Sequence, residues 1–293
     1  MPAQIIDGKA LAAQIELELR GDVEKLIPRL GRAPGLAVVL VGDNPASQVY
    51  VRSKSKRAQA CGLSVTDVKL PGDVSQASLE AALKQLNSDP AVDGILLQLP
   101  LPKGLDELSA LCAIDPRKDA DGLHPANQGL LVRAAPAPRP CTPFGVMKLI
   151  AQARKQLGLD PKISGLHAVV VGRSILVGKP QALLLLEENC TVTVCHSKTV
   201  DLAAECRRAD IVVAAVGRPQ LVTKAFLKPG AIVIDVGINQ DASGKLVGDV
   251  EFAGACEVAA AVTPVPGGVG PMTIAMLLSN TVDIAKRSVG IKG

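Results

Sequence analysis

Tyr50 and Lys54 lie in the segment QVYVRSK, residues 48–54, and Tyr50 is the only tyrosine of the chain. On a helix, side chains four residues apart stand side by side on one face, and Ser47 lies one turn earlier on that face. An aromatic ring beside a lysine amine suits acid–base chemistry next to a ligand. The same pair also fits a polar patch on a surface helix. Other residues of the sequence are needed to distinguish these two interpretations.

A second candidate site lies in VVVGRSILVGKP, residues 169–180. A strand, a glycine, a loop, a second glycine and a helix follow one another there in the order of a nucleotide-binding turn. Gly172 permits a tight turn after the strand, and Gly178 lets backbone N–H groups approach a phosphate at the helix N-terminus. The spacing departs from GxGxxG, and a tight turn without a ligand is the alternative.

The strand that follows this turn ends in His196-Ser197-Lys198-Thr199 and carries no acidic residue. NAD-binding units usually place an Asp or Glu about 20 residues after the turn to hold the ribose 2′-hydroxyl. Hydroxyl groups and a lysine suit a 2′-phosphate better, and Arg173 can grip that phosphate with its forked N–H groups. The sequence therefore favours NADP over NAD, with solvated loop residues as the alternative.

Further polar residues lie where ligands commonly bind. Gln98 ends an apolar run, at the carboxyl edge where open α/β sheets bind ligands. Asp121 lies in the turn-like segment KDADGLHP, and the uncharged loop PVPGGVGP, residues 264–271, suits a wall for a flat ligand. Taken singly, these features also fit a strand-end hydrogen bond, a turn residue and a helix connection.

The composition excludes several classes of protein. An apolar fraction of 48% and a charged fraction of 20% are typical of a globular chain rather than a disordered one. The chain has no Trp, one Tyr and three Phe, so it lacks the rings that a single-strand nucleic-acid binder stacks on bases. The net charge of +4, with scattered basic residues, suits a small anionic ligand. No apolar run approaches the roughly 20 residues of a membrane span.

The seven cysteines are odd in number and form no CxxC motif. Because the N-terminal segment turns charged too early for a secretory leader, we expect reduced thiols in a cytoplasmic protein. We expect no metal site.

The pattern of apolar residues predicts two α/β domains. Residues 35–42, 64–70 and 92–102 resemble strands, and they alternate with helical segments at 45–61 and 75–89. Asn44 is the expected N-cap of the first helix and Pro45 its first residue. This βαβαβ order predicts a parallel sheet with helices on its faces.

A loop-rich stretch, residues 116–143, then marks a domain boundary. A second α/β set follows, with strands expected at 167–172, 191–195, 210–216 and 231–237 and a last helix ending near Arg287.

A Tyr-x-x-x-Lys pair also occurs in short-chain dehydrogenases. In those enzymes the glycine-rich turn opens the chain and the pair follows far downstream. Here Tyr50 and Lys54 precede Gly172, so the order of the motifs excludes that class.

Seven segments occur in one order along essentially the full chain: VYVRSK, GILLQLPLP, KDADGLHPAN, RPCTPFGV, GRSILVGKP, CHSKT and PVPGGVGPMT. Together they resemble the bifunctional methylenetetrahydrofolate dehydrogenase/methenyltetrahydrofolate cyclohydrolase family. The resemblance implies a folate-binding catalytic domain of residues 1–140, completed by a C-terminal helix at 271–293. It also implies a Rossmann-like NADP-binding domain of residues 141–270, with folate in a cleft between the domains.

The resemblance also implies residue roles. Lys54 is the implied catalytic lysine and Gln98 its hydrogen-bonding partner, while Tyr50 stacks on the folate. Asp121 accepts hydrogen bonds from the amino-pyrimidine edge of the pterin. The implied catalytic residues are Lys54, Gln98, Tyr50 and Asp121. The implied substrate-binding residues are Ser47, Tyr50, Gln98, Leu99, Pro100, Asp121, Pro264, Gly267, Gly268 and Pro271. The implied cofactor-binding residues are Gly172, Arg173, Ser174, Gly178, Lys179, Pro180, His196, Ser197, Thr199, Gly237 and Ile238.

The implied activity is oxidation of 5,10-methylenetetrahydrofolate with NADP, followed by hydrolysis to 10-formyltetrahydrofolate, in one-carbon metabolism and purine biosynthesis. A dehydrogenase without cyclohydrolase activity and a non-catalytic nucleotide-binding regulator are the alternatives. The segment INQDASGKLVGD, residues 238–249, has the turn signals of a projecting hairpin. The resemblance implies that this hairpin joins two subunits in a homodimer.

Overall fold

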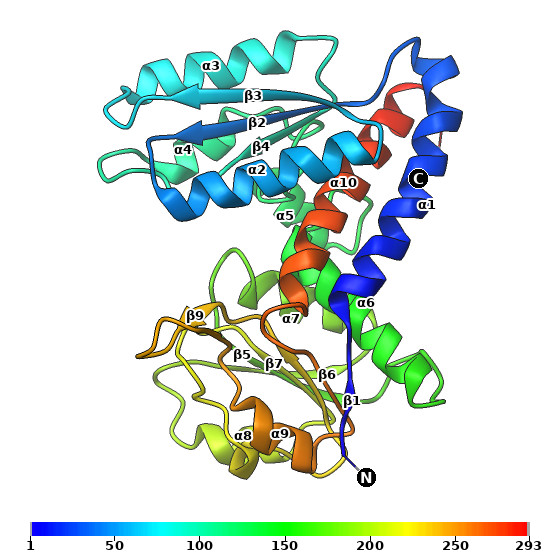
Figure 1. The fold of residues 1–293 in the computed structure, drawn as a ribbon, viewed down its shortest axis with the longest axis vertical. Helices are drawn as coiled ribbons and strands as arrows, with labels where there is room; N and C mark the ends of the chain where they lie inside the picture. The colour runs from blue at the N-terminus through cyan, green and yellow to red at the C-terminus, as the bar shows by residue number, and fades with distance from the viewer. Residues whose placement is uncertain (1, 292–293) are drawn as a thin grey trace. The chain divides into compact units, whose positions relative to one another are not determined.

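The computed structural model describes residues 2–291. The chain divides into two compact units, with the divisions after Ala12, Cys141 and Thr273 (Figure 1). We call them the three-stranded unit, residues 13–141 with 274 onward, and the six-stranded unit, residues 142–273 with the segment up to Ala12. None of the helices described between residues 2 and 291 combines the length and apolarity needed to cross a bilayer.

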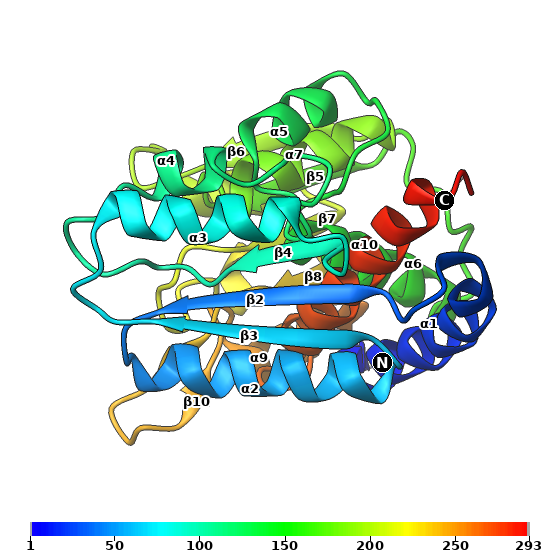
Figure 2. The ribbon, with the colours of Figure 1, turned by 90° about the horizontal axis from the view of Figure 1, so that it is seen from above.

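The three-stranded unit is built on a parallel sheet in the order β3-β2-β4. Its strands are β2 (Gly35–Val41), β3 (Ser64–Leu70) and β4 (Gly94–Leu97). Every residue of β2 and β4 is buried, which explains their uninterrupted apolar runs. Two helices, α2 (Pro45–Ala60) and α3 (Gln76–Ser88), cover opposite faces of this sheet (Figure 2).

Alternate residues of β2 form the core beneath α3. Ala37, Val39 and Val41 point to that face and pack with Leu79 and Leu83 of the helix. The side chains alternate because successive residues of a strand face opposite sides of the sheet. The predicted βαβαβ order of this region is confirmed.

Helix α2 begins as the sequence predicts. The side chain of Asn44 accepts a hydrogen bond from the Ser47 N–H, and Pro45 is the first helical residue. Gly62 follows the helix with a φ of 86°, a left-handed conformation that favours glycine. These two ends fix which residues of α2 face the sheet.

The stretch of residues 116–143, predicted to be mainly loop, contains more helix than expected. Helix α5 (Pro125–Val132) lies within it, and α6 (Cys141–Gln156) begins inside its last residues. The His124 side chain caps α5, and Pro125 is its first residue. These two helix-start signals were overlooked because the segment contains many prolines. A short helix, α4 (Glu107–Cys112), precedes this stretch.

The six-stranded unit contains a parallel sheet in the order β1-β11-β8-β7-β5-β6. Its strands are β5 (His167–Val171), β6 (Thr191–Cys195), β7 (Ile211–Ala214), β8 (Ile232–Asp235), β11 (Ala261–Val262) and β1 (Gln4–Ile5). Its helices are α7 (Gly178–Glu187), α8 (Leu202–Arg207), the 3₁₀ turn η1 (Lys224–Phe226) and α9 (Phe252–Val258). β6 and β7 pair with opposite sides of β5, so the order in which strands are added to the sheet reverses at β5. Such a reversal leaves a crevice at the carboxyl end of the strand.

The N-terminal segment lies in a different unit from the one expected. We expected residues 1–140 to form one domain, but β1 pairs in parallel with β11, Gln4 opposite Ala261 and Ile5 opposite Val262. Two long helices, α1 (Gly8–Leu30) and α10 (Val269–Ser288), therefore begin in the six-stranded unit and continue in the other. A two-residue strand leaves almost no pattern in a sequence, which is why its pairing was not foreseen.

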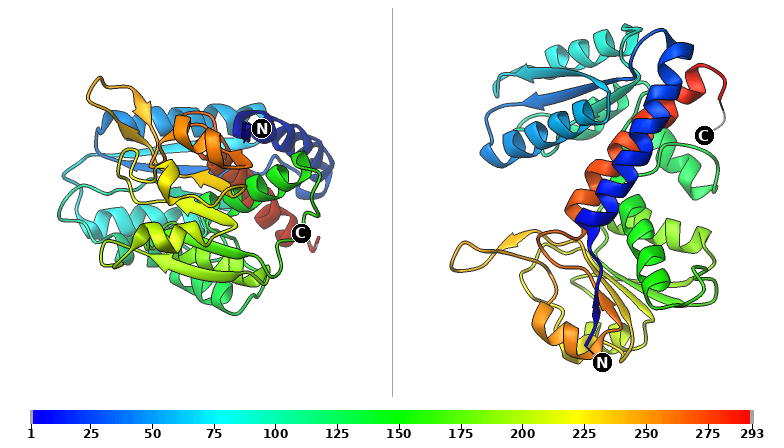
Figure 3. Two further views of the ribbon diagram at one scale, coloured as in Figure 1. Left: turned by 90° about the horizontal axis from the view of Figure 1, so that it is seen from below. Right: turned by 45° about the vertical axis from the view of Figure 1, so that its right-hand side comes forward.

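The predicted hairpin is present. Strands β9 (Asn239–Gln240) and β10 (Leu246–Val247) pair antiparallel, and they extend away from the main sheet of their unit (Figure 3).

Replacing Asn44 tests how strongly the cap of α2 contributes to stability. Asn44→Ala removes the acceptor for the Ser47 N–H, so we expect the free energy of unfolding to fall by about 1 kcal/mol. Asn44→Ser keeps a side-chain acceptor and should lose much less. Urea unfolding followed by circular dichroism measures both changes, and equal stability of Asn44→Ala and the wild type would contradict the assignment.

Candidate active site and nucleotide pocket

The side chain of Lys54 ends inside the three-stranded unit rather than on its surface. Lys54 is 5% exposed and lies on the face of α2 that packs against the sheet. Its Nζ donates a hydrogen bond of 2.9 Å to Oε1 of Gln98, the residue that follows β4. The Gln98 amide in turn donates to the Leu99 carbonyl at 2.6 Å, which fixes the orientation of its oxygen toward the lysine. The surface-patch interpretation of Lys54 is therefore wrong.

Burial determines the acid–base state of Lys54. Removal from water lowers the pKa of its ammonium group, and the nearby Asp121 carboxylate opposes that shift by a smaller amount. Gln98 is neutral, so it orients the amine without adding the charge that would stabilise the protonated form. The result is a lysine whose neutral form is more accessible than that of a surface lysine.

Tyr50 stands next to this amine. The Nζ of Lys54 lies 5.1 Å from the centre of the Tyr50 ring, as the four-residue spacing predicts. Burial raises the pKa of the Tyr50 phenol, and the Asp121 carboxylate raises it further. Ser47 is 9% exposed on the same helix. The structure thus brings together the predicted group of Ser47, Tyr50, Lys54, Gln98 and Asp121 in one unit.

Asp121 lies in a constrained turn after β4. The segment before it runs parallel to β4, with Ala120 N donating to the Ile95 carbonyl. Gly122 has a φ of 71°, and a Cβ there would overlap the backbone of Arg139. Leu99 and Pro100 follow Gln98 directly in the chain.

The predicted proline–glycine loop belongs to the other unit. Pro264, Gly267 and Gly268 connect β11 to α10, and Pro271 lies in the first turn of that helix. The Gly267 carbonyl accepts a hydrogen bond from Lys9 N at 2.9 Å. A Cβ on Gly268 would overlap the Pro264 carbonyl, so the loop requires glycine for its tight path.

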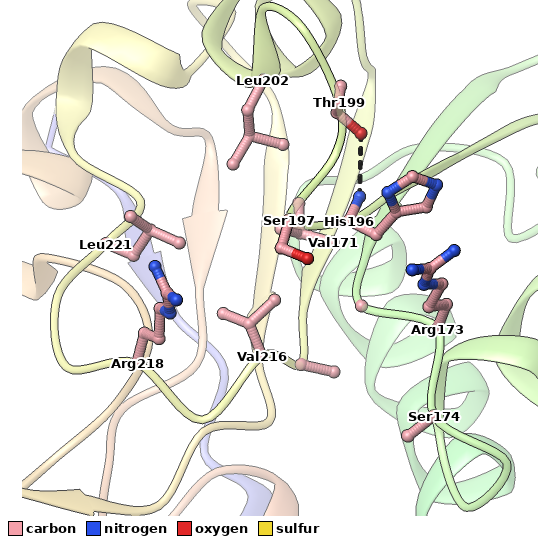
Figure 4. A pocket seen from close by; sticks show the side chains of 12 residues that line it. Val171, Arg173, Ser174, His196, Ser197, Thr199, Leu202, Val216, Arg218 and Leu221 are labelled. Carbon is pink, nitrogen blue, oxygen red and sulfur yellow. Dashed lines mark hydrogen bonds between the residues drawn. The ribbon is translucent and has the colours of Figure 1, made fainter.

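A pocket of about 470 Å³ lies at the carboxyl ends of β5, β6 and β7 in the six-stranded unit (Figure 4). This is the point where the strand order reverses, at which open α/β sheets bind nucleotides. Val171, Leu202, Val216 and Leu221 supply apolar surface, and Arg173 and Arg218 approach from two different loops. The residues that line the pocket are Val171, Gly172, Arg173, Ser174, His196, Ser197, Thr199, Leu202, Ala215, Val216, Arg218 and Leu221.

The chemistry of this lining suits an anion. Its lining residues include two arginines and the hydroxyls of Ser174, Ser197 and Thr199, but no carboxylate. The loop after β6 is held by a hydrogen bond from His196 N to the Thr199 hydroxyl, 2.9 Å long. A nucleotide with a 2′-phosphate fits this set of groups, because guanidinium forks bind phosphate oxygens in pairs.

The glycines predicted to shape the turn occupy tight positions. Gly172 has a φ of 132°, and a Cβ there would overlap the Ala215 carbonyl. A Cβ on Gly178 would overlap the backbone of Gly172 itself. The Ser174 hydroxyl accepts from the backbone N–H groups of Val177 and Gly178 at the start of α7.

The other predicted cofactor residues lie outside the lining of this pocket. Lys179 and Pro180 lie in the first turn of α7. Gly237 and Ile238 follow β8, and Gly237 N donates to the buried Asp235 carboxylate at 3.0 Å.

The loop that follows β7 was not foreseen from the sequence. Asp249 is fully buried and accepts hydrogen bonds from the backbone N–H groups of Val216, Gly217 and Arg218, at 2.6, 3.0 and 2.8 Å. Asp249 N donates in turn to Asp235, whose pKa burial raises to about 6. The only signal in the sequence was the position of Arg218 just beyond an apolar strand.

Two domain descriptions of one family together match most of the chain. The description "Tetrahydrofolate dehydrogenase/cyclohydrolase, catalytic domain" matches residues 6–121, and "Tetrahydrofolate dehydrogenase/cyclohydrolase, NAD(P)-binding domain" matches residues 140–289. The chain belongs to the tetrahydrofolate dehydrogenase/cyclohydrolase family. The resemblance found in the sequence is confirmed.

Individual relatives align with nearly the whole chain. The "Bifunctional protein FolD" of Magnetococcus marinus is 57% identical over 289 residues, which cover 99% of this chain and 99% of the relative. The bifunctional FolD structure from Campylobacter jejuni has a TM-score of 0.93 at 46% identity, covering 98% of this chain and 99% of that one. The Trypanosoma brucei FolD structure, complexed with NADP cofactor and inhibitor, has a TM-score of 0.92 at 45% identity and covers 99% of each chain.

Gly178→Ala tests the packing of the nucleotide turn. The added methyl group would overlap the Gly172 backbone, so we expect a loss of roughly 1–3 kcal/mol in stability and weaker nucleotide binding. Gly129→Ala is the control, because nothing lies within 4 Å of its Cβ position in α5, and it should leave stability unchanged or raise it by up to about 1 kcal/mol. Thermal unfolding and dye-displacement binding measure the effects, and a Gly178→Ala protein as stable as Gly129→Ala would contradict the tight packing of this turn.

Proposed function

We propose that this protein oxidises 5,10-methylenetetrahydrofolate to 5,10-methenyltetrahydrofolate with NADP and then hydrolyses the product to 10-formyltetrahydrofolate. Membership of the family, through both domain descriptions, supports both activities. The observation that carries the hydrolytic step is the buried Lys54 ammonium, 2.9 Å from a neutral amide and 5.1 Å from the centre of a tyrosine ring. An intact Lys54–Gln98 pair favours the bifunctional enzyme over a dehydrogenase alone.

The first step depends on alignment more than on acid–base groups. NADP, when bound, would accept a hydride with its two electrons from the methylene carbon, which would leave a methenyl cation on the folate. The task of the protein is to hold two flat rings in register. Tyr50 supplies a rigid face for the folate.

The second step requires proton transfers. Water adds to the methenyl carbon and loses one proton, and as the new C–O bond becomes a carbonyl, the second proton moves to the departing ring nitrogen. We assign the acceptance and delivery of these protons to Lys54, because burial lowers its pKa toward the working range of a base. The cationic methenyl group lowers that pKa further while it is bound.

The remaining folate contacts are assigned by chemistry. The Asp121 carboxylate is suited to accept two hydrogen bonds from the amino-pyrimidine edge of the pterin. We propose that Ser47, Leu99 and Pro100 complete the contacts from the three-stranded unit. From the six-stranded unit we assign Pro264, Gly267, Gly268 and Pro271.

We assign the 470 Å³ pocket to NADP, with Arg173, Arg218 and Ser197 as ligands of the 2′-phosphate. The absence of a carboxylate among its lining residues supports NADP, because an acid there would hold a 2′-hydroxyl and repel a phosphate. Gly172, Ser174, His196 and Thr199 also line this pocket. Gly178, Lys179, Pro180, Gly237 and Ile238 are assigned to the pyrophosphate and nicotinamide ends.

We further propose a homodimer formed through the hairpin of β9 and β10. Its short strands leave backbone groups unpaired on their outer edges, which favours pairing with a second copy. We also propose a cytoplasmic location, since every one of the seven cysteines is a free thiol.

Lys54→Met should separate the two activities. It keeps the length and apolar stem of the side chain but removes the amine, so cyclohydrolase activity should fall by about 10²–10⁴-fold while hydride transfer survives in part. Methenyltetrahydrofolate should then accumulate, and its absorbance measures the effect. Lys56→Met, an exposed position on the same helix, is the control. Full cyclohydrolase activity in Lys54→Met would refute the proposed role.

Arg173→Ala should reduce the preference for NADP. Loss of the guanidinium removes a charge-assisted contact to the 2′-phosphate, so KM for NADP should rise by about tenfold or more. KM for NAD, which lacks that phosphate, should change little and serves as the internal control. A wild-type kcat/KM that is equal or higher with NAD would overturn the cofactor assignment.

The oligomeric state can be measured by light scattering. At micromolar concentration we expect a mass near twice the 30.2 kDa of one chain. A mass of a single chain would contradict the proposed homodimer without affecting the assigned reaction.

A further inference from the structure

The backbone on both sides of Asp121 is held by side chains that the reaction itself does not use. Asn280, in the C-terminal half of α10, is 4% exposed and lies in the same unit as Asp121. Its amide nitrogen donates to the Ala120 carbonyl and to the Arg139 carbonyl, both at 2.9 Å. A single amide thus ties the residue before Asp121 to the backbone of Arg139.

Asp119 holds the other side of the turn. It is 1% exposed, and its carboxylate accepts hydrogen bonds from Leu123 N at 3.2 Å, His124 N at 2.8 Å and the Asn127 amide at 2.9 Å. The turn that carries Asp121 is therefore closed between its first and last residues.

The third support is Cys141, the first residue of α6. Its N–H donates to the Asp121 carbonyl at 3.3 Å, and its thiol donates to the Ala120 carbonyl at 3.4 Å. The Asn280 amide also reaches this thiol, at 3.5 Å. Burial raises the pKa of the Cys141 thiol well above its ordinary value, so the group stays neutral.

This bracing matters because Asp121 acts on the proton-transfer groups. Its carboxylate raises the pKa of Lys54 against the effect of burial, and it also raises that of Tyr50. The other groups that face Lys54 are the Tyr50 ring, the neutral Gln98 and the Cys141 thiol. An electrostatic interaction of this kind changes with the distance between the charges. A small displacement of the turn would therefore change the pKa of Lys54.

We infer that Asn280 and Asp119 are positioning residues of the folate site, which fix the Asp121 carboxylate relative to the Lys54 ammonium from the two sides of the turn. This inference rests on the proposed function. Asn280 carries the cleaner test, because it is uncharged, whereas replacing Asp119 also removes a carboxylate from the neighbourhood.

The experiment compares Asn280→Ala with Thr281→Val. Thr281 is the next residue of the same helix, is fully buried and donates only within the helix, to the Leu277 carbonyl, so it reports the general cost of altering α10. The measurements are KM for folate, KM for NADP, the pH dependence of cyclohydrolase activity and the Lys54 pKa from NMR titration of labelled lysine. Asn280→Ser, which retains a short hydroxyl donor, is the second variant if the alanine protein does not fold.

In Asn280→Ala we expect KM for folate to rise by about 5- to 30-fold, with KM for NADP unchanged. Displacement of Asp121 weakens its support of the lysine charge, so the Lys54 pKa should fall. The limb of the cyclohydrolase profile that requires neutral Lys54 should then move to lower pH. Asn280→Ser should shift the same quantities less, and Thr281→Val should leave them at wild-type values.

An unchanged folate KM and Lys54 pKa in a folded Asn280 variant would overturn the inference, even if the melting temperature fell, because the residue would then be purely structural. The same shifts in Thr281→Val would also overturn it. If the Lys54 pKa moves but the cyclohydrolase profile does not follow, the positioning role stands and the proposed role of Lys54 fails.

Discussion

The burial of the Lys54 ammonium is the constraint on which the candidate active site depends. An amine that is 5% exposed loses most of its hydration, and it persists only where a hydrogen-bond acceptor meets it. Gln98 provides that acceptor at 2.9 Å and adds no charge. A carboxylate in its place would hold the lysine protonated, so the neutrality of the partner keeps proton transfer available.

The backbone of the surrounding elements positions the residues around Lys54. The cap at Asn44 sets where α2 begins, and the end of β4 sets the position of Gln98. The Asp121 turn, closed by Asp119, places a carboxylate where it moderates the effect of burial on the lysine. In the six-stranded unit the reversal of strand order opens the nucleotide pocket, and Asp249 fixes the loop that carries Arg218.

The sequence predicts local features well and long-range pairings poorly. The Asn44-Pro45 start of α2 and the buried run of β2 were foreseen because caps and apolar periodicity are properties of neighbouring residues. The pairing of β1 with β11 and the hydrogen bonds of Asn280 to Ala120 and Arg139 were not, since they join residues far apart in the chain. Family motifs identified the reacting groups, but the motifs did not indicate which residues hold them in place.

The most direct test of the account is the pKa of Lys54 in the unliganded wild-type protein. It can be measured by NMR titration of lysine labelled at Nζ, with the Lys54→Met spectrum assigning the signal. We expect a pKa clearly below the ordinary value of about 10.4, with the other lysines as internal references. A Lys54 pKa at or above that value would show that burial does not prepare the amine for proton transfer, and it would contradict the central claim.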